Sequence, residues 1–127
     1  MVKKWDVTIP KLSGDKTRRA YIWLPEDYEE NKDKRYPVMY MFDGHNVFFD
    51  EDATYGKSWG MAKYMRENPR DLIIVGVECN HEGNRRLVEY APMTYTNSEH
   101  GHIKGKGSIM MNWLVRTLKP YVDETYR

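Results

Sequence analysis

The stretch from Tyr36 to Asn46, with the sequence YPVMYMFDGHN, constrains the fold of this chain more than any other. A continuous apolar run of strand-forming residues follows Pro37 and closes abruptly on Asp43-Gly44-His45-Asn46. This pattern predicts a strand buried on both faces, followed by a tight polar turn. In open α/β sheets, ligands meet the protein just beyond the carboxyl ends of such strands. We therefore expect the first candidate chemistry at residues 43–46.

The flanking segments predict a mixed sheet. Residues 4–9 and 17–24 are two runs of strand-forming residues separated by a short polar turn, which favours an antiparallel hairpin. Residues 58–67 have helical spacing, and residues 71–78 form a second apolar strand. With the strand at 37–42 they predict a strand–helix–strand unit whose two strands are parallel.

The last third of the chain predicts less regular structure. Residues 79–106 show no clear hydrophobic period, so we expect a long loop of the kind that often carries function. Residues 107–126 carry an apolar stripe at helical spacing, with a kink or break expected at Pro120. A helix after the second parallel strand should lead to a third strand. One apolar strand edge would then lack its neighbour, which favours pairing with another chain or partner segment, including a homodimer.

Composition excludes several classes of protein. The 127 residues are sufficient for one domain, with a formal charge of +1 that favours neither nucleic acid nor an anionic membrane as partner. No window reaches the ~18 apolar residues of a membrane span, and the N-terminus does not look like a secretory signal. Cys79 is the only cysteine. A single cysteine fits a reducing compartment, so the sequence predicts a cytoplasmic protein.

Two patterns suggest chemistry but have simpler interpretations. Gly56-Lys57-Ser58-Trp59-Gly60 satisfies the G-x-S-x-G pattern, yet a nucleophile elbow requires a buried strand directly before it, and an acidic segment precedes Gly56. We interpret Ser58 as a helix N-cap. The chain has four histidines whose spacing matches no zinc template, so no metal site is expected: His45, His81, His100 and His102.

Several motifs in chain order make the sequence similar to the esterase-D-like branch of the α/β-hydrolase superfamily. They are Trp23-Leu24-Pro25-Glu26-Asp27-Tyr28, the stretch at 36–46, Ser58-Trp59-Gly60, Ile74-Val75-Gly76-Val77, Arg86-Leu87-Val88-Glu89-Tyr90-Ala91-Pro92 and Leu118-Lys119-Pro120-Tyr121-Val122-Asp123. The resemblance covers only the amino-terminal half of the family's domain. It implies that residues 1–127 form one partial α/β-hydrolase sandwich, in which the segments bearing the nucleophile, acid and histidine are absent.

The resemblance also implies a role for the turn at 43–46. In α/β-hydrolases one oxyanion donor comes from the loop after the third strand. The resemblance therefore implies that the backbone N–H of His45 is an oxyanion-hole donor, with Gly44 and Asn46 at the substrate. The long loop at 79–106 is a second candidate for the lining of the cleft, with Arg86 in contact with the substrate. The simpler alternatives are a turn held by Asp43 and Asn46, and an Arg86 that pairs with Glu89 or anchors its loop.

The implied function is that of the amino-terminal part of a serine carboxylic-ester hydrolase acting on a small-molecule ester, without a cofactor. On this interpretation, the 127 residues alone have no esterase activity. The alternative is a non-catalytic binding or assembly module that uses the half-fold and is completed by dimerisation or by a partner chain.

Overall fold

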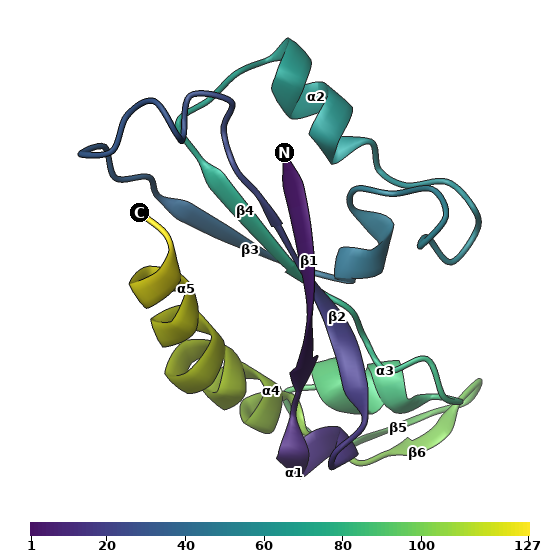
Figure 1. Ribbon diagram of the computed structural model, residues 1–127. Helices are drawn as coiled ribbons and strands as arrows, with labels where there is room; N and C mark the ends of the chain where they lie inside the picture. Colours follow the sequence, from purple (N-terminus) through teal and green to yellow (C-terminus); the bar gives the residue numbers. More distant parts are fainter. The chain divides into compact units, whose positions relative to one another are not determined.

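The computed structural model describes residues 1–127, which form two compact units (Figure 1). Unit 1 comprises Met1–Val7 and Arg18–Cys79, and unit 2 comprises Thr8–Thr17 and Asn80–Arg127. None of the helices is long and apolar enough to cross a lipid bilayer.

Unit 1 is built on a four-stranded sheet with the strand order β1-β2-β4-β3. The strands are β1 (Val2–Thr8), β2 (Thr17–Trp23), β3 (Val38–Phe42) and β4 (Ile73–Val77). The predicted mixed sheet is confirmed, since β4 pairs antiparallel with β2 and parallel with β3.

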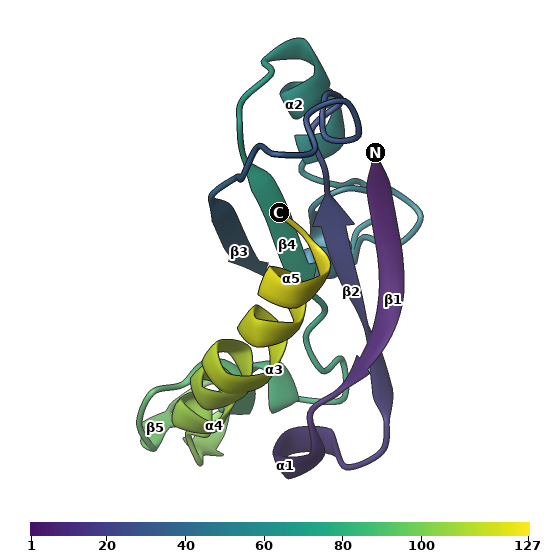
Figure 2. The same cartoon turned by 60° about the vertical axis from the view of Figure 1, so that its left-hand side comes forward.

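The leading hairpin is also confirmed. The amide of Leu24 donates a 2.9 Å hydrogen bond to the carbonyl of Met1, which places the end of β2 beside the start of β1. Figure 2 shows the two strands side by side, running in opposite directions. The predicted turn between them contains a short helix, α1 (Pro10–Ser13).

The two apolar strands differ in their burial. All five residues of β4 are buried, as a central strand of β-branched residues should be. In β3, by contrast, Met39 is 37% exposed and Phe42 is 43% exposed. The prediction that β3 is buried on both faces was therefore wrong. The apolar run does specify a strand, but β3 lies at the edge of the sheet with a strand on one side only.

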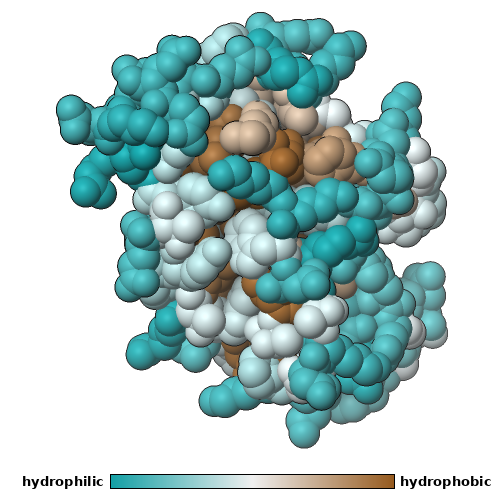
Figure 3. Space-filling model, viewed as in Figure 1, coloured by the Kyte–Doolittle hydropathy of each residue, from teal (hydrophilic) through white to brown (hydrophobic).

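One face of the sheet in unit 1 carries a hydrophobic cluster. It joins alternate residues of β2, one residue of β4, the loop after β3 and the helix α2 (Met61–Glu67): Tyr21, Trp23, Ile74, Val47, Phe48 and Met65. Partly buried apolar residues pack around it, and Figure 3 shows apolar atoms reaching the surface beside α2. Burial of each large side chain contributes about 2 kcal/mol to the free energy of folding, so this cluster holds the loop and the helix on the sheet.

Helix α2 begins later than the sequence predicts. Its first residue is Met61, because Gly60 adopts a left-handed conformation with φ of 68° and interrupts the helix at that point. Trp59 precedes this break and is 55% exposed.

Unit 2 contains regular structure where a long loop was expected. Helix α3 (Arg85–Tyr90) is followed by a small antiparallel sheet of β5 (Tyr95–Asn97) and β6 (Gly101–Ile103). The expectation of a loop over 79–106 was wrong because these elements are three to six residues long. Runs that short display almost no hydrophobic period.

The final helical segment continues past Pro120. It consists of α4 (Gly107–Trp113), a π-helical turn (Leu114–Leu118) and α5 (Lys119–Thr125). Pro120 lies in the first turn of α5, directly after the π-helical turn, in which the amide of Lys119 donates to the carbonyl of Leu114. The helix continues through Pro120, so the predicted break is wrong, and the predicted kink stays a prediction. The departure from a regular α-helix is the π-helical turn just before the proline.

Candidate functional site

The turn after β3 is a short 3₁₀ helix, η1 (Gly44–Asn46), at the carboxyl end of the strand. Asp43 leads into it with φ of 55° and ψ of 46°, a left-handed conformation that Asp adopts more readily than most residues. The amide of Asn46 donates to the carbonyl of Asp43 at 2.9 Å, and the amide of Val47 donates to that of Gly44 at 3.2 Å. The amide of His45 immediately precedes the amides of Asn46 and Val47 in this turn. It lies at the edge of the sheet where the sequence predicts the functional site.

Gly44 holds η1 directly against the neighbouring strand β4. A Cβ atom on Gly44 would lie 2.5 Å from both the carbonyl carbon of Gly76 and the nitrogen of Val77. A Cβ on Gly76 would lie 2.9 Å from the Cα of Gly44. Glycine is therefore required at both positions because two backbones meet there. Gly44 is needed for this close approach to Gly76 and not for a positive φ, because the residue of the turn with positive φ is Asp43.

The next two residues of η1 tie a distant part of the loop to the sheet. The buried ring of His45 has its Nε2 3.1 Å from Oγ1 of Thr54. The side-chain oxygen of Asn46 accepts a 2.9 Å hydrogen bond from the amide of Thr54, and its carbonyl accepts one of 2.7 Å from Trp59. These contacts assign a structural function to both side chains, and the substrate contact predicted for Asn46 stays a prediction.

Ser58 is held in a turn that precedes α2. Its amide donates a 2.8 Å hydrogen bond to Asp50, and its Oγ accepts one of 3.1 Å from the amide of Gly60. The bond from the Ser58 backbone lowers the pKa of Asp50. No strand leads into Ser58, which a nucleophile elbow would require. The expected N-cap is wrong in position, since Gly60 is the cap residue, but Ser58 caps the preceding turn.

A cluster of opposite charges fastens the same loop to the sheet. Arg19 of β2 forms ion pairs with Asp52 and with Glu78, whose side chains are only 8% and 9% exposed. Lys4 pairs with Asp52 at 2.7 Å, and the hydroxyl of Tyr21 donates to it at 2.9 Å. Burial alone would raise the pKa of Asp52, but these hydrogen bonds and the charge of Arg19 outweigh it and lower the pKa.

Arg86 lies in unit 2, on the exposed side of α3. Its guanidinium carbon is 5.3 Å from the centre of the Tyr90 ring, a cation–π geometry. Glu89 is buried and accepts a hydrogen bond from the amide of Asn80, so it anchors the start of its own segment. The predicted substrate contact of Arg86 stays a prediction.

The exposed histidines of unit 2 have partners of their own. Nε2 of His100 lies 3.8 Å from a carboxylate oxygen of Glu99, and Nδ1 of His102 lies 3.5 Å from the hydroxyl of Thr96. The absence of a metal or cofactor stays a prediction.

Some residues of the site were missed by sequence reasoning. Gly76 was recognised only as part of a strand, and Thr54 was not singled out at all. The single available signal was the glycine inside an otherwise continuous apolar strand, which often marks the close approach of another backbone.

The sequence as a whole decides the family. The family described as "Putative esterase" matches residues 13–127, nearly the entire chain. The chain belongs to this family. The resemblance on which the sequence prediction rested is thereby confirmed, while a search of curated proteins finds no significant match.

Solved structures share the fold. An IroE-like serine hydrolase from Shewanella oneidensis matches with a TM-score of 0.68 and 22% identity over 100% of this chain. The BES protein from Bacillus cereus has a TM-score of 0.61 with 21% identity over 98% of the chain, and a ferulic acid esterase has 0.53 with 16% over 100%. This chain of the esterase family spans 39%, 46% and 45% of those chains, respectively.

Proposed function

We propose that this chain supplies the oxyanion-hole loop and part of the substrate cleft of a serine carboxylic-ester hydrolase that acts on a small-molecule ester. In such an enzyme a serine, activated by a histidine that an acid orients, attacks the ester carbonyl. Negative charge then develops on the carbonyl oxygen. Residues outside this chain would supply the three catalytic side chains, and the His45 amide would be one of the two N–H donors to the oxyanion.

The observation that supports this role most directly is the rigid attachment of η1 to β4. The contact between Gly44 and Gly76 leaves η1 no room to shift toward the sheet. On its other side, Asn46 and His45 are tied to Thr54. An oxyanion donor works because it is fixed before the charge appears, so a turn held from both sides suits this function.

The N–H can be tested separately from the side chain in the active esterase that contains residues 1–127. His45→Pro removes the amide hydrogen at the start of a helical turn, where proline is tolerated. Loss of one oxyanion donor lowers kcat by about 10² to 10³. His45→Ala is the matched control, because it deletes the ring and its contact with Thr54 but keeps the N–H, and it should lose less than about tenfold. The proposal would be contradicted if the two variants lost kcat equally while circular dichroism showed that both are folded.

The 127-residue chain alone provides a second test. Hydrolysis of a p-nitrophenyl acyl ester should not exceed the uncatalysed background, because the proposed donor has no nucleophile beside it. Turnover that disappears in Ser58→Ala would show instead that Ser58 is a nucleophile.

A non-catalytic assembly module is the second candidate, and the exposure of β3 favours it. Met39 and Phe42 give this edge strand an apolar surface that another strand could cover. A stable dimer by light scattering that Met39→Lys dissociates would support the module. A monomer at all concentrations would exclude the dimeric form.

A further inference from the structure

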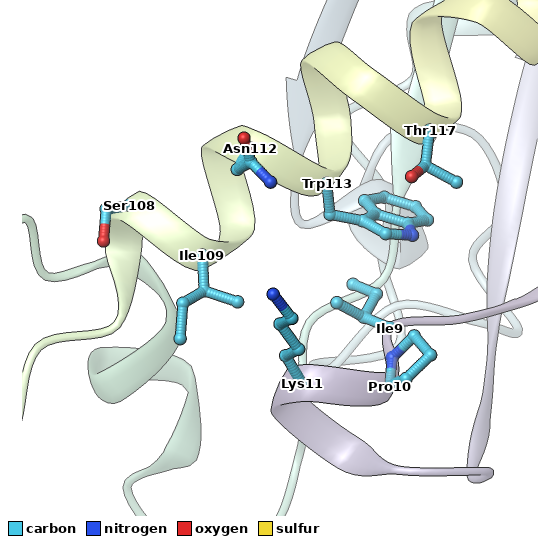
Figure 4. Close-up of a pocket in the computed structure, with 8 residues that line it drawn as sticks. All are labelled: Ile9, Pro10, Lys11, Ser108, Ile109, Asn112, Trp113 and Thr117. Atoms are coloured by element: carbon cyan, nitrogen blue, oxygen red, sulfur yellow. The ribbon is translucent and has the colours of Figure 1, made fainter.

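A cavity in unit 2, remote in sequence from the turn at 43–46, has the lining of a ligand site (Figure 4). Its volume is about 480 Å³, within the range of small-molecule sites. One side comes from α1 and the residue before it, and the other from α4 and the π-helical turn: Ile9, Pro10, Lys11, Ser108, Ile109, Asn112, Trp113 and Thr117. A π-helical turn inside a helix is frequently found at functional sites.

The apolar part of the cavity is firmly built. Ile9 is 1% exposed and Trp113 is 8% exposed, so both side chains are held by the fold around them. In Figure 4 the indole of Trp113 lies over Ile9 and Pro10 and forms part of one wall of the cavity. An aromatic ring packed against an indole gains about 1 kcal/mol beyond its buried area, so a planar ligand body suits this wall.

The polar part of the cavity carries one positive charge. Lys11 is the only ionisable residue of the lining. Two other lysines of unit 2 are in ion pairs, Lys16 with Glu82 and Lys119 with Asp123, and Lys11 takes no part in these pairs. Figure 4 shows the ammonium of Lys11 directed toward the side chain of Asn112, with Ser108 and Thr117 farther along the same helical face. The lining therefore offers several hydrogen-bond donors and a single cation, which matches a monoanion.

We propose that this cavity binds an aromatic monocarboxylate. The ring would lie against Trp113 and Ile109, and the carboxylate would accept hydrogen bonds from Lys11 and Asn112. A single cation is too little for a polyphosphate, and a cationic ligand would be repelled by Lys11. The proposal does not depend on the esterase function, because it concerns other residues and requires no turnover.

The test is an NMR titration of the protein with 3-phenylpropionate, in which the indole N–H resonance of Trp113 is monitored. That resonance is assigned by its loss in Trp113→Phe. We expect a saturable shift with the acid, and at least tenfold weaker binding of 3-phenylpropanamide, which has the same shape without the charge. A tenfold change corresponds to about 1.4 kcal/mol, the lower end expected for a hydrogen bond to a charged group.

Two variants of equal charge distinguish the site from general attraction. Lys11→Met should weaken binding of the acid about tenfold, whereas Lys16→Met, three residues beyond α1 on the same segment, should leave it within twofold. Asn112→Leu should also weaken it. Equal affinity for acid and amide, equal effects of the two lysine variants, or the absence of saturation would each overturn the proposal.

Discussion

The sharpest prediction concerns the contact between η1 and β4, and its perturbation is Gly44→Ala. The new Cβ would lie 2.5 Å from two backbone atoms of β4, about 0.9 Å short of the 3.4 Å at which ordinary contact begins. Those atoms cannot yield easily, because β4 is paired on both sides. Overpacking costs about 1–3 kcal/mol, while alanine recovers about 0.4–1 kcal/mol by restricting the unfolded chain. We expect a net loss of about 2 kcal/mol in the free energy of unfolding.

Urea denaturation of the chain measures this loss. Gly60→Ala is the control, because its Cβ would meet no atom within 4 Å and only the strain of its left-handed backbone, with φ of 68° and ψ of 28°, remains, about 1 kcal/mol. Gly76→Ala, with its closest contact at 2.9 Å, should destabilise less than Gly44→Ala. If the proposed function holds, the displacement of η1 in Gly44→Ala should also lower the kcat of an esterase that contains this chain about 10²-fold. The reasoning is refuted if Gly44→Ala is no less stable than Gly60→Ala.

Further predictions concern the charge cluster beneath the loop. The lowered pKa of Asp52 means that its ionised form stabilises the fold above the pKa it has in the unfolded chain, and that this stability disappears as the pH falls through the lower folded pKa. Urea midpoints of the wild type should therefore decline more between pH 6 and pH 2.5 than those of Asp52→Asn. Arg19→Met leaves two mostly buried carboxylates without their shared cation and should cost about 3 kcal/mol in urea unfolding, whereas a loss below about 1 kcal/mol would show solvent screening instead. Tyr21→Phe removes one hydrogen bond and should cost about 1 kcal/mol, and an unchanged midpoint would show that water replaces it.

The sheet could be predicted because its strands are long enough to display their pattern. The apolar runs at 37–42 and 71–78 become the parallel pair β3 and β4. What the pattern could not reveal is which strand lies at the edge, because Met39 and Phe42 are as apolar as the buried residues of β4. Whether a strand lies at the edge depends on which other strands pair with it, and the residues of the strand itself do not specify this.

The location of the candidate site was predictable, but the packing that supports it was not. The polar turn at 43–46 ends a strand as expected. The contact between Gly44 and Gly76 depends on the parallel register, and the bonds to Thr54 depend on the path of a loop without periodicity. The left-handed Gly60 moved the start of α2 for a similar reason, since a glycine in helical spacing does not reveal its φ.

The π-helical turn between α4 and α5 has a consequence for how this chain tolerates change. Its buried side chains follow steps of three, five and four residues, from Met110 to Trp113, Leu118 and Val122. The step of five falls across the wide turn, which absorbs the additional residue so that α5 keeps its apolar side facing inward. Deletion of one residue between 114 and 117 would restore an ordinary step of four and the regular α-helical ladder. This position is therefore one where the length of the sequence can vary by a residue while the orientation of the following helix is preserved.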